Sequence, residues 1–163
     1  MPPPLRSIHP THLARPAHPA PPRPLGLPAD ARSVPRARRA VLDALPDPHR
    51  PRLGGDLQLL ASELVTNAVR HGTRPAEDHL VELLLWPADG HYWLAVSDPG
   101  PGAPVLSPTD ASDASACGGR GLLLVDALSA VWGVVPRRVR GKAVVAGLRL
   151  DTGDHAPDDH APQ

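Results

Sequence analysis

The pattern of apolar and polar residues predicts two helices in the first half of the chain. The first covers residues 33–45, with Ser33 as a suitable N-cap, a proline in its first turn and three prolines beyond its end. The second covers residues 56–71, with Asp56 as its N-cap and apolar residues at the 3.6-residue spacing of a helix. These apolar residues are Leu57, Leu60, Ala61, Leu64 and Ala68. We therefore expect the second helix to bury one stripe and to end at Gly72.

The second half of the chain has the pattern of two hairpins joined by a loop and a helix. Four segments have strand patterning. They are Leu80–Trp86, His91–Ser97, Val131–Pro136 and Lys142–Leu150. Pro87–Gly90 is a hairpin signal, Asp98–Gly118 is a long loop rich in Pro, Gly, Ser and Asp, and Gly121–Ser129 is a third helix. This order predicts an α+β fold, a two-layer sandwich of a mostly antiparallel sheet with helices on one face.

Proline is concentrated ahead of these elements. Eleven of the 23 prolines fall in residues 1–35, and the first part of the chain has no apolar periodicity. We expect a disordered Pro-rich tail over 1–24, one folded domain over 25–151 and a second disordered tail over 152–163. The apolar runs are shorter than the roughly 18–20 residues that a bilayer span needs, and no signal peptide is predicted.

Charge and cysteine content narrow the classes of partner. Lys plus Arg total 17 and Asp plus Glu total 17, so the zero formal charge gives no overall field for direct nucleic-acid binding or for a membrane surface. The single cysteine, Cys117, excludes an internal disulfide and any multi-cysteine metal site. We therefore expect a cytoplasmic protein without nucleic-acid or membrane partners.

Three polar residues form a row on the second predicted helix. Glu63, Asn67 and His71 are four residues apart, so they share one face, which borders the apolar stripe. An isolated spacing of this kind is most often a solvated polar edge. The functional interpretation is that Asn67 offers an oxygen ligand to Mg²⁺ while Glu63 orients or deprotonates a nucleophile beside a phosphate.

Two glycine-rich segments are further candidates. Asp98 ends the second strand and can accept a hydrogen bond from an exocyclic amine such as that of adenine, while Gly100 and Gly102 let the backbone approach a flat base. A proline-glycine turn is the alternative for this segment. Gly118–Leu122 opens the third helix, where free N–H groups and the helix dipole favour an anion, the alternative being a flexible lead-in. No Gly-Lys-Ser/Thr follows, so this is not a Walker A loop.

The ordered set of three motifs resembles the GHKL (Bergerat-fold) ATP-binding domain over about residues 25–150. Within that superfamily, the anti-sigma-factor serine kinase branch of small actinobacterial proteins is similar in two runs, SELVTNAVRHG and GGRGLLLVD. The resemblance implies ATP and Mg²⁺ as cofactors, with Glu63 as general base and Asn67 as Mg²⁺ ligand. It implies that Asp98 reads the adenine amino group and that Gly100 and Gly102 pass beneath the base.

The same resemblance implies which residues face the phosphates of ATP. This chain also differs from the family pattern at two places. It implies an ATP lid over residues 104–118 and a second glycine box facing the phosphates. The residues of this box are Gly119, Arg120, Gly121 and Leu122. Where the family has Gly-Lys-Thr, whose Thr helps to hold the adenine-reading Asp, this chain has Ala143 after Lys142, and the lid contains no Lys or Arg. Loss of one neutral hydrogen bond costs about 1 kcal/mol, so we expect ATP binding to be several-fold weaker.

The resemblance implies an ATP- and Mg²⁺-dependent serine protein kinase that acts as an anti-sigma-factor-type regulator. Its partners would be an antagonist protein that it phosphorylates and a sigma factor, and the branch also suggests a homodimer. The alternative is a non-catalytic ATP-binding module that binds a transcription-regulatory partner, which the uncharged lid favours. A sensor histidine kinase fragment and a DNA-binding protein are less well supported by the sequence.

Overall fold

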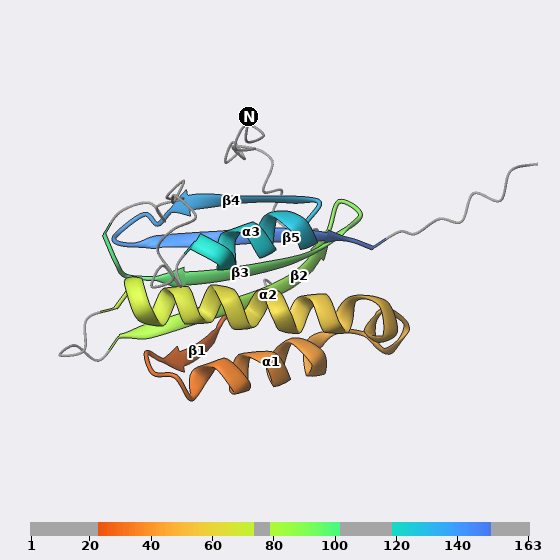
Figure 1. The fold of residues 1–163 in the computed structure, drawn as a ribbon, viewed down its shortest axis with the longest axis horizontal. Helices are drawn as coiled ribbons and strands as arrows, with labels where there is room; N and C mark the ends of the chain where they lie inside the picture. The colour runs from red at the N-terminus through yellow and green to blue at the C-terminus, as the bar shows by residue number, and fades with distance from the viewer. Residues whose placement is uncertain (1–22, 74–78, 102–118, 151–163) are drawn as a thin grey trace, which may run out of the picture.

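In the described part of the chain, a five-stranded antiparallel sheet forms one layer and three α-helices form the other (Figure 1). The computed structural model describes residues 23–73, 79–101 and 119–150. Its elements are β1 (Leu25–Pro28), α1 (Ser33–Ala44), the 3₁₀ turn η2 (Asp47–His49), α2 (Arg50–His71), β2 (Leu80–Ala88), β3 (His91–Asp98), α3 (Gly119–Leu128), β4 (Val131–Pro136) and β5 (Lys142–Arg149). The predicted α+β fold class is confirmed.

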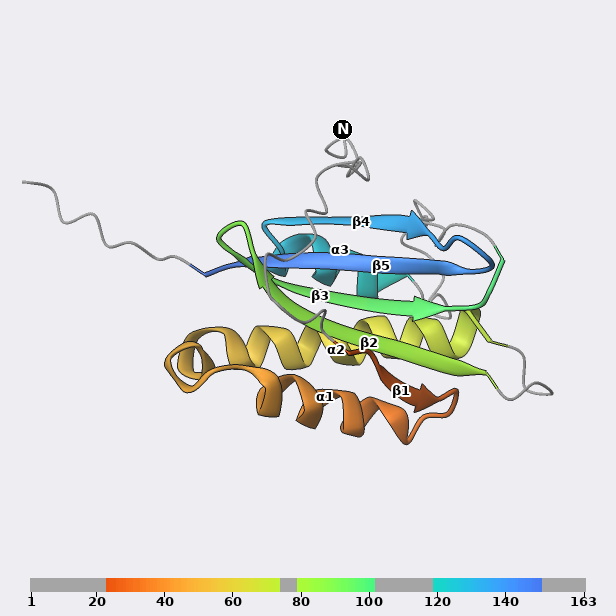
Figure 2. The ribbon, with the colours of Figure 1, turned by 180° about the vertical axis from the view of Figure 1, so that it is seen from behind.

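The strands lie in the order β1-β2-β3-β5-β4, and each neighbouring pair is antiparallel. Strands β2 and β3 extend to Ala88 and from His91, so the hairpin turn is shorter than expected and consists of Asp89 and Gly90. Both turn residues have positive φ, 50° and 70°, which is the geometry that fits the twist of a two-residue hairpin. Seen from behind, the sheet has α1, α2 and α3 on its far side (Figure 2).

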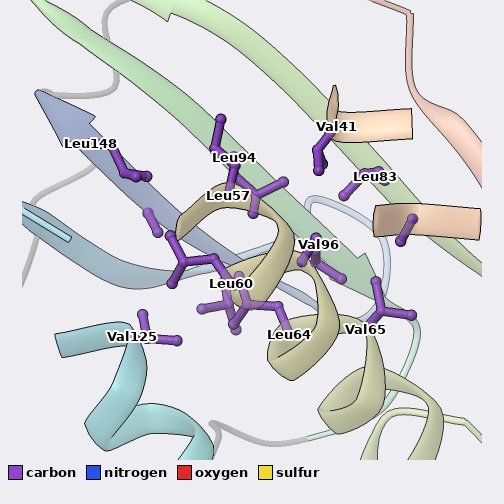
Figure 3. Packing of buried hydrophobic residues seen from close by; sticks show 14 of the residues in the cluster. Val41, Leu57, Leu60, Leu64, Val65, Leu83, Leu94, Val96, Val125 and Leu148 are labelled. Atoms are coloured by element: carbon purple, nitrogen blue, oxygen red, sulfur yellow. The ribbon is translucent and has the colours of Figure 1, made fainter. Parts of the chain in front are cut away.

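Helix α2 is central to the core, as its apolar stripe predicted. All five stripe residues are at most 3% exposed. In Figure 3, Leu57, Leu60 and Leu64 of this helix lie between Val125 of α3 and Leu94 of β3. At the edge of the core, the Tyr92 hydroxyl donates a hydrogen bond to the Ala44 carbonyl (3.0 Å) and links β3 to the end of α1.

The predicted start of α2 at Asp56 is wrong, because the helix begins at Arg50. Pro51 lies in the first turn, where a missing N–H costs no intrahelical bond. Gly54 is inside the helix and packs against α1, since a Cβ there would come within 3.0 Å of Cδ2 of Leu42. The close approach of the two helices thus explains why a glycine lies inside α2.

The predicted cap of α1 is also wrong. The N-cap position is Arg32, and the buried Ser33 hydroxyl instead donates to the Pro28 carbonyl (2.6 Å), which ties α1 to β1. The short edge strand β1 was not predicted, although Leu27 is fully buried in the core. Helix α3 begins two residues earlier than expected.

Some predictions concern residues that the structure does not describe. Apart from residues 23 and 24, the two expected tails lie outside the described residues, as does the loop segment 102–118. In the described part of the chain, no helix combines the length and the apolar character that a bilayer span requires.

Candidate functional site

Asp98 is the last residue of β3, and it is almost completely buried. It is 3% exposed, and its Oδ1 accepts hydrogen bonds from the Gly100 N–H (2.9 Å) and from Nζ of Lys142 (3.0 Å). Lys142 is the residue opposite Asp98 in the register of β3 with β5, and it is itself buried. The carboxylate is therefore held rigidly at the end of the strand by a buried ion pair.

Three glycines make the space that Asp98 occupies. A Cβ at Gly72, just after α2, would collide with the Asp98 carboxyl group. A Cβ at Gly141 would collide with the Asp98 carbonyl, and Gly141 also has a positive φ of 93°. A Cβ at Gly100 would lie 2.7 Å from Cα of Gly72. The end of α2, the end of β3 and the turn before β5 thus converge on this carboxylate, and side chains at these three positions would prevent it.

Glu63 and Asn67 lie one turn apart on α2 and face the start of α3. A Cβ at Gly121 would be 2.9 Å from Oε2 of Glu63 and 3.2 Å from Nδ2 of Asn67. Both side chains are half-buried, and neither has a hydrogen-bond or ion-pair partner among the described residues. The structure therefore brings together Glu63, Asn67 and Gly121, which are separated in the sequence by a hairpin and a long loop. Unpaired oxygens beside the N-terminus of a helix suit a metal ion and a phosphate.

A pocket of about 210 Å³ adjoins Asp98. Its lining includes Gly100 and Pro101 from the loop after β3, His71 and Thr73 from the end of α2, and Arg140. His71, the third member of the predicted row, therefore belongs to this pocket, whereas Glu63 and Asn67 do not line it. Prolines, glycines and a cation are a suitable surface for a flat, electron-rich group.

The polar contact expected to be missing at Ala143 is not one to Asp98 in this structure, and the several-fold weaker ATP binding stays a prediction. Successive side chains of a strand point to opposite faces, and Ala143 pairs with Ser97 on the face away from the helices. Lys142 is the β5 residue on the same face as Asp98, and it supplies the contact. Sequence reasoning missed Lys142, Gly72 and Gly141 because their role depends on strand register and on close packing between distant segments.

The remaining predicted site residues are described only in part. Gly102 lies outside the described residues. Gly119 and Arg120 form the first turn of α3, where their backbone is described. The Leu122 side chain is 3% exposed and belongs to the hydrophobic core, so it faces away from solvent.

Comparison with known families fits this arrangement. The family described as histidine kinase-like ATPase domain matches residues 27–146. The chain belongs to this family. Its GHKL domains bind ATP, usually with Mg²⁺. The match includes both α2 and the end of β3, so the residues that converge in the structure lie within the family domain.

Solved structures and curated proteins add little to the family match. The histidine kinase domain of the blue-light-activated histidine kinase from Erythrobacter litoralis EL346 is 29% identical, with a TM-score of 0.44. The alignment covers 60% of this chain and 44% of that one, so the ATPase domain described here spans less than half of that structure. No match was found among curated proteins.

Proposed function

We propose that this ATPase domain is a Mg²⁺- and ATP-dependent serine protein kinase that regulates transcription by phosphorylating an antagonist protein. The observation that supports this most directly is the placement of Glu63 and Asn67. Both polar groups are half-buried, have no partner among the described residues and face Gly121 at the start of α3. A solvated polar edge would not face a helix N-terminus at such close range.

Asp98 is proposed to recognise adenine. Its Oδ1 is occupied by Gly100 and Lys142, whereas no described residue bonds to its Oδ2. The second oxygen is thus left to accept a hydrogen bond from the exocyclic amine of the base. Because the contact with Lys142 fixes the position of the carboxyl group, the acceptor is oriented before the nucleotide arrives.

The N-terminus of α3 is proposed to bind the phosphates of ATP. Gly119 and Gly121 carry no side chain beside its first N–H groups, and the helix dipole favours negative charge there. The residues also fit a Mg²⁺ ion. Asn67 would hold the ion through its side-chain oxygen, in the space beside Gly121 that a Cβ at Gly121 would fill. A bound Mg²⁺ ion neutralises charge on the phosphates during phosphoryl transfer.

Glu63 is proposed to act as the general base. It accepts the proton of the partner's serine hydroxyl as the serine oxygen bonds to the γ-phosphorus of ATP, and the bond to the β–γ bridging oxygen breaks to release ADP. Glu63 suits this role because no cation among the described residues neutralises it. The proposed partners are the phosphorylated antagonist and a sigma factor that the same protein sequesters.

A second candidate function is that of a non-catalytic module, in which bound ATP stabilises the conformation that binds a regulatory partner. The observation that favours it is the absence of Lys and Arg from residues 104–118 of the sequence. Phosphoryl transfer requires positive charge around the γ-phosphate, and that segment provides none.

Phosphotransfer and nucleotide binding measured on the same variants separate the two functions. The full chain is incubated with Mg-ATP and proteins captured from the source cell, and phosphoserine is identified by mass spectrometry. We expect Glu63→Gln to abolish transfer and to keep ATP binding, while Arg70→Gln, an exposed change on the same helix, keeps both. Binding without transfer to any captured partner would select the non-catalytic module, and absence of binding would refute both functions.

A further inference from the structure

The sheet face opposite the helices is apolar, although no described helix covers it (Figure 2). We call it the open face. Its apolar residues are Leu84, Trp86, Ala88, Trp93, Ala95, Val131, Val135, Ala143 and Val145. An antiparallel sheet that faces water on one side normally carries polar residues there. The composition of the open face therefore indicates that it is covered in the native protein.

The centre of the open face is already shielded from solvent. Trp93, Ala95 and Val145 are only 5%, 7% and 3% exposed. The neighbours of Val145 across the sheet are Ala95 and Gly133, and the Trp93 ring lies over Gly147, two residues further along β5. Among the described residues, no helix or strand lies over this centre. Trp93, Ala95 and Val145 thus form the buried centre of a hydrophobic cluster on the open face.

Two tryptophans make an aromatic platform at one end of the open face. Trp86 and Trp93 are opposite each other in the β2–β3 register and stack with their ring centroids 6.2 Å apart at 15°. The Trp93 ring extends over Gly147, where a Cβ would lie 3.0 Å from it. Nε1 of Trp93 donates to the Ala88 carbonyl, whereas Nε1 of Trp86 is buried without a partner. A covering segment that offers a free carbonyl would satisfy this donor.

We propose that the proline-rich segment of residues 1–22 packs on the open face in polyproline-II conformation. Eight of its 22 residues are proline, together with Leu5, Ile8 and Leu13, and it contains no acidic residue. A polyproline-II chain has no internal hydrogen bonds, so its carbonyls are free, and such chains dock on aromatic surfaces at a low entropic cost. Its prolines would stack on the Trp86–Trp93 platform, and one carbonyl would accept from Trp86.

The position and length of the segment fit this role. It leads into β1, which pairs with β2, the strand that carries Trp86. At about 3.1 Å per residue the segment reaches roughly 70 Å, whereas four strands about 4.8 Å apart are far narrower. The other terminal segment, residues 151–163, has four Asp and no Val, Leu or Ile, and is chemically unsuited to an apolar face. Docking would bury the apolar side chains of the segment, which has no apolar periodicity with which to form a core of its own.

Paramagnetic relaxation enhancement tests the placement in the full chain. A nitroxide is attached at Ala14→Cys in a Cys117→Ser background, and amide signals are measured in ¹⁵N-labelled protein. We expect strong broadening at Trp86, Trp93 and Val145 and little at α1, with no such pattern from a control label at Ala161→Cys. Equal, weak broadening over all strands and helices would overturn the proposal. Broadening seen only between molecules, in a mixture of ¹⁵N-labelled and spin-labelled chains, would also overturn it and assign the face to a second copy.

Tryptophan quenching provides an independent readout. Residues 2–22 are replaced by a Gly/Ser sequence of equal length in a Trp132→Phe background, so that only Trp86 and Trp93 emit. We expect acrylamide quenching to rise several-fold and emission to shift to the red, while circular dichroism shows an intact domain. Unchanged quenching in the folded variant would contradict docking of the segment.

Discussion

The ion pair between Lys142 and Asp98 allows a quantitative prediction for the variant Lys142→Met. The two charged atoms are 3.0 Å apart, and the side chains are only 11% and 4% exposed. At an effective dielectric constant of about 20, their attraction is about 5.5 kcal/mol. Because the methionine removes the cation and leaves the carboxylate buried, we expect the free energy of unfolding to fall by about 3–5 kcal/mol.

Urea unfolding followed by circular dichroism measures this loss through the midpoint and slope of the transition. Arg137→Met is the matched control, because its pair with Glu82 is about one third exposed on each side and should be worth less than about 1 kcal/mol. The double variant Asp98→Asn/Lys142→Met removes both charges, so it should be more stable than Lys142→Met alone. If Lys142→Met costs no more than Arg137→Met, the reasoning on the buried pair is refuted.

Three further predictions use other features of the structure. Gly121→Ala should weaken ATP binding in calorimetry without unfolding the domain, because the new Cβ would be 3.2 Å from Nδ2 of Asn67, the proposed Mg²⁺ ligand; unchanged affinity would contradict this packing. Gly55→Ala, which meets no atom within 4 Å, should stabilise α2 by about 0.5–1 kcal/mol in the same urea assay; a loss of stability would argue against a continuous helix there. Burial raises the pKa of Tyr92. The contribution of this neutral side chain to the free energy of unfolding should therefore be fully present below pH about 10 and be lost as the pH rises through the raised pKa. Absorbance at 295 nm reports this single tyrosine, and a fall in stability of equal size in Tyr92→Phe would show that another group is responsible.

Local patterns predicted the part of the site that depends on helix periodicity. The apolar stripe of α2 determines which side of the helix is buried, and it places Glu63 and Asn67 together at the border of the core. The start of α3 at a glycine box was also readable, because glycines before an apolar run favour a helix N-terminus. These features involve residues within a few turns of each other.

The sequence alone could not establish the contacts that depend on tertiary structure. Lys142 and Asp98 are 44 residues apart, and their pairing follows from the register of β3 with β5. The start of α2 was misplaced because Pro51 and Gly54 usually interrupt helices, whereas packing against α1 makes a glycine favourable here. The apolar pattern of the open face was present in the strands, but only the sheet order shows that its residues form one surface.

Isothermal titration calorimetry with ATP and Mg²⁺ tests the central claim, that one site joins the end of β3 to the start of α3 through Asn67 of α2. We predict measurable binding by the full chain, weaker binding when EDTA removes the metal, and loss of this metal dependence in Asn67→Ala but not in the exposed control Arg70→Ala. No heat of binding by the unaltered protein, or the same metal-dependent affinity in Asn67→Ala, would contradict the account.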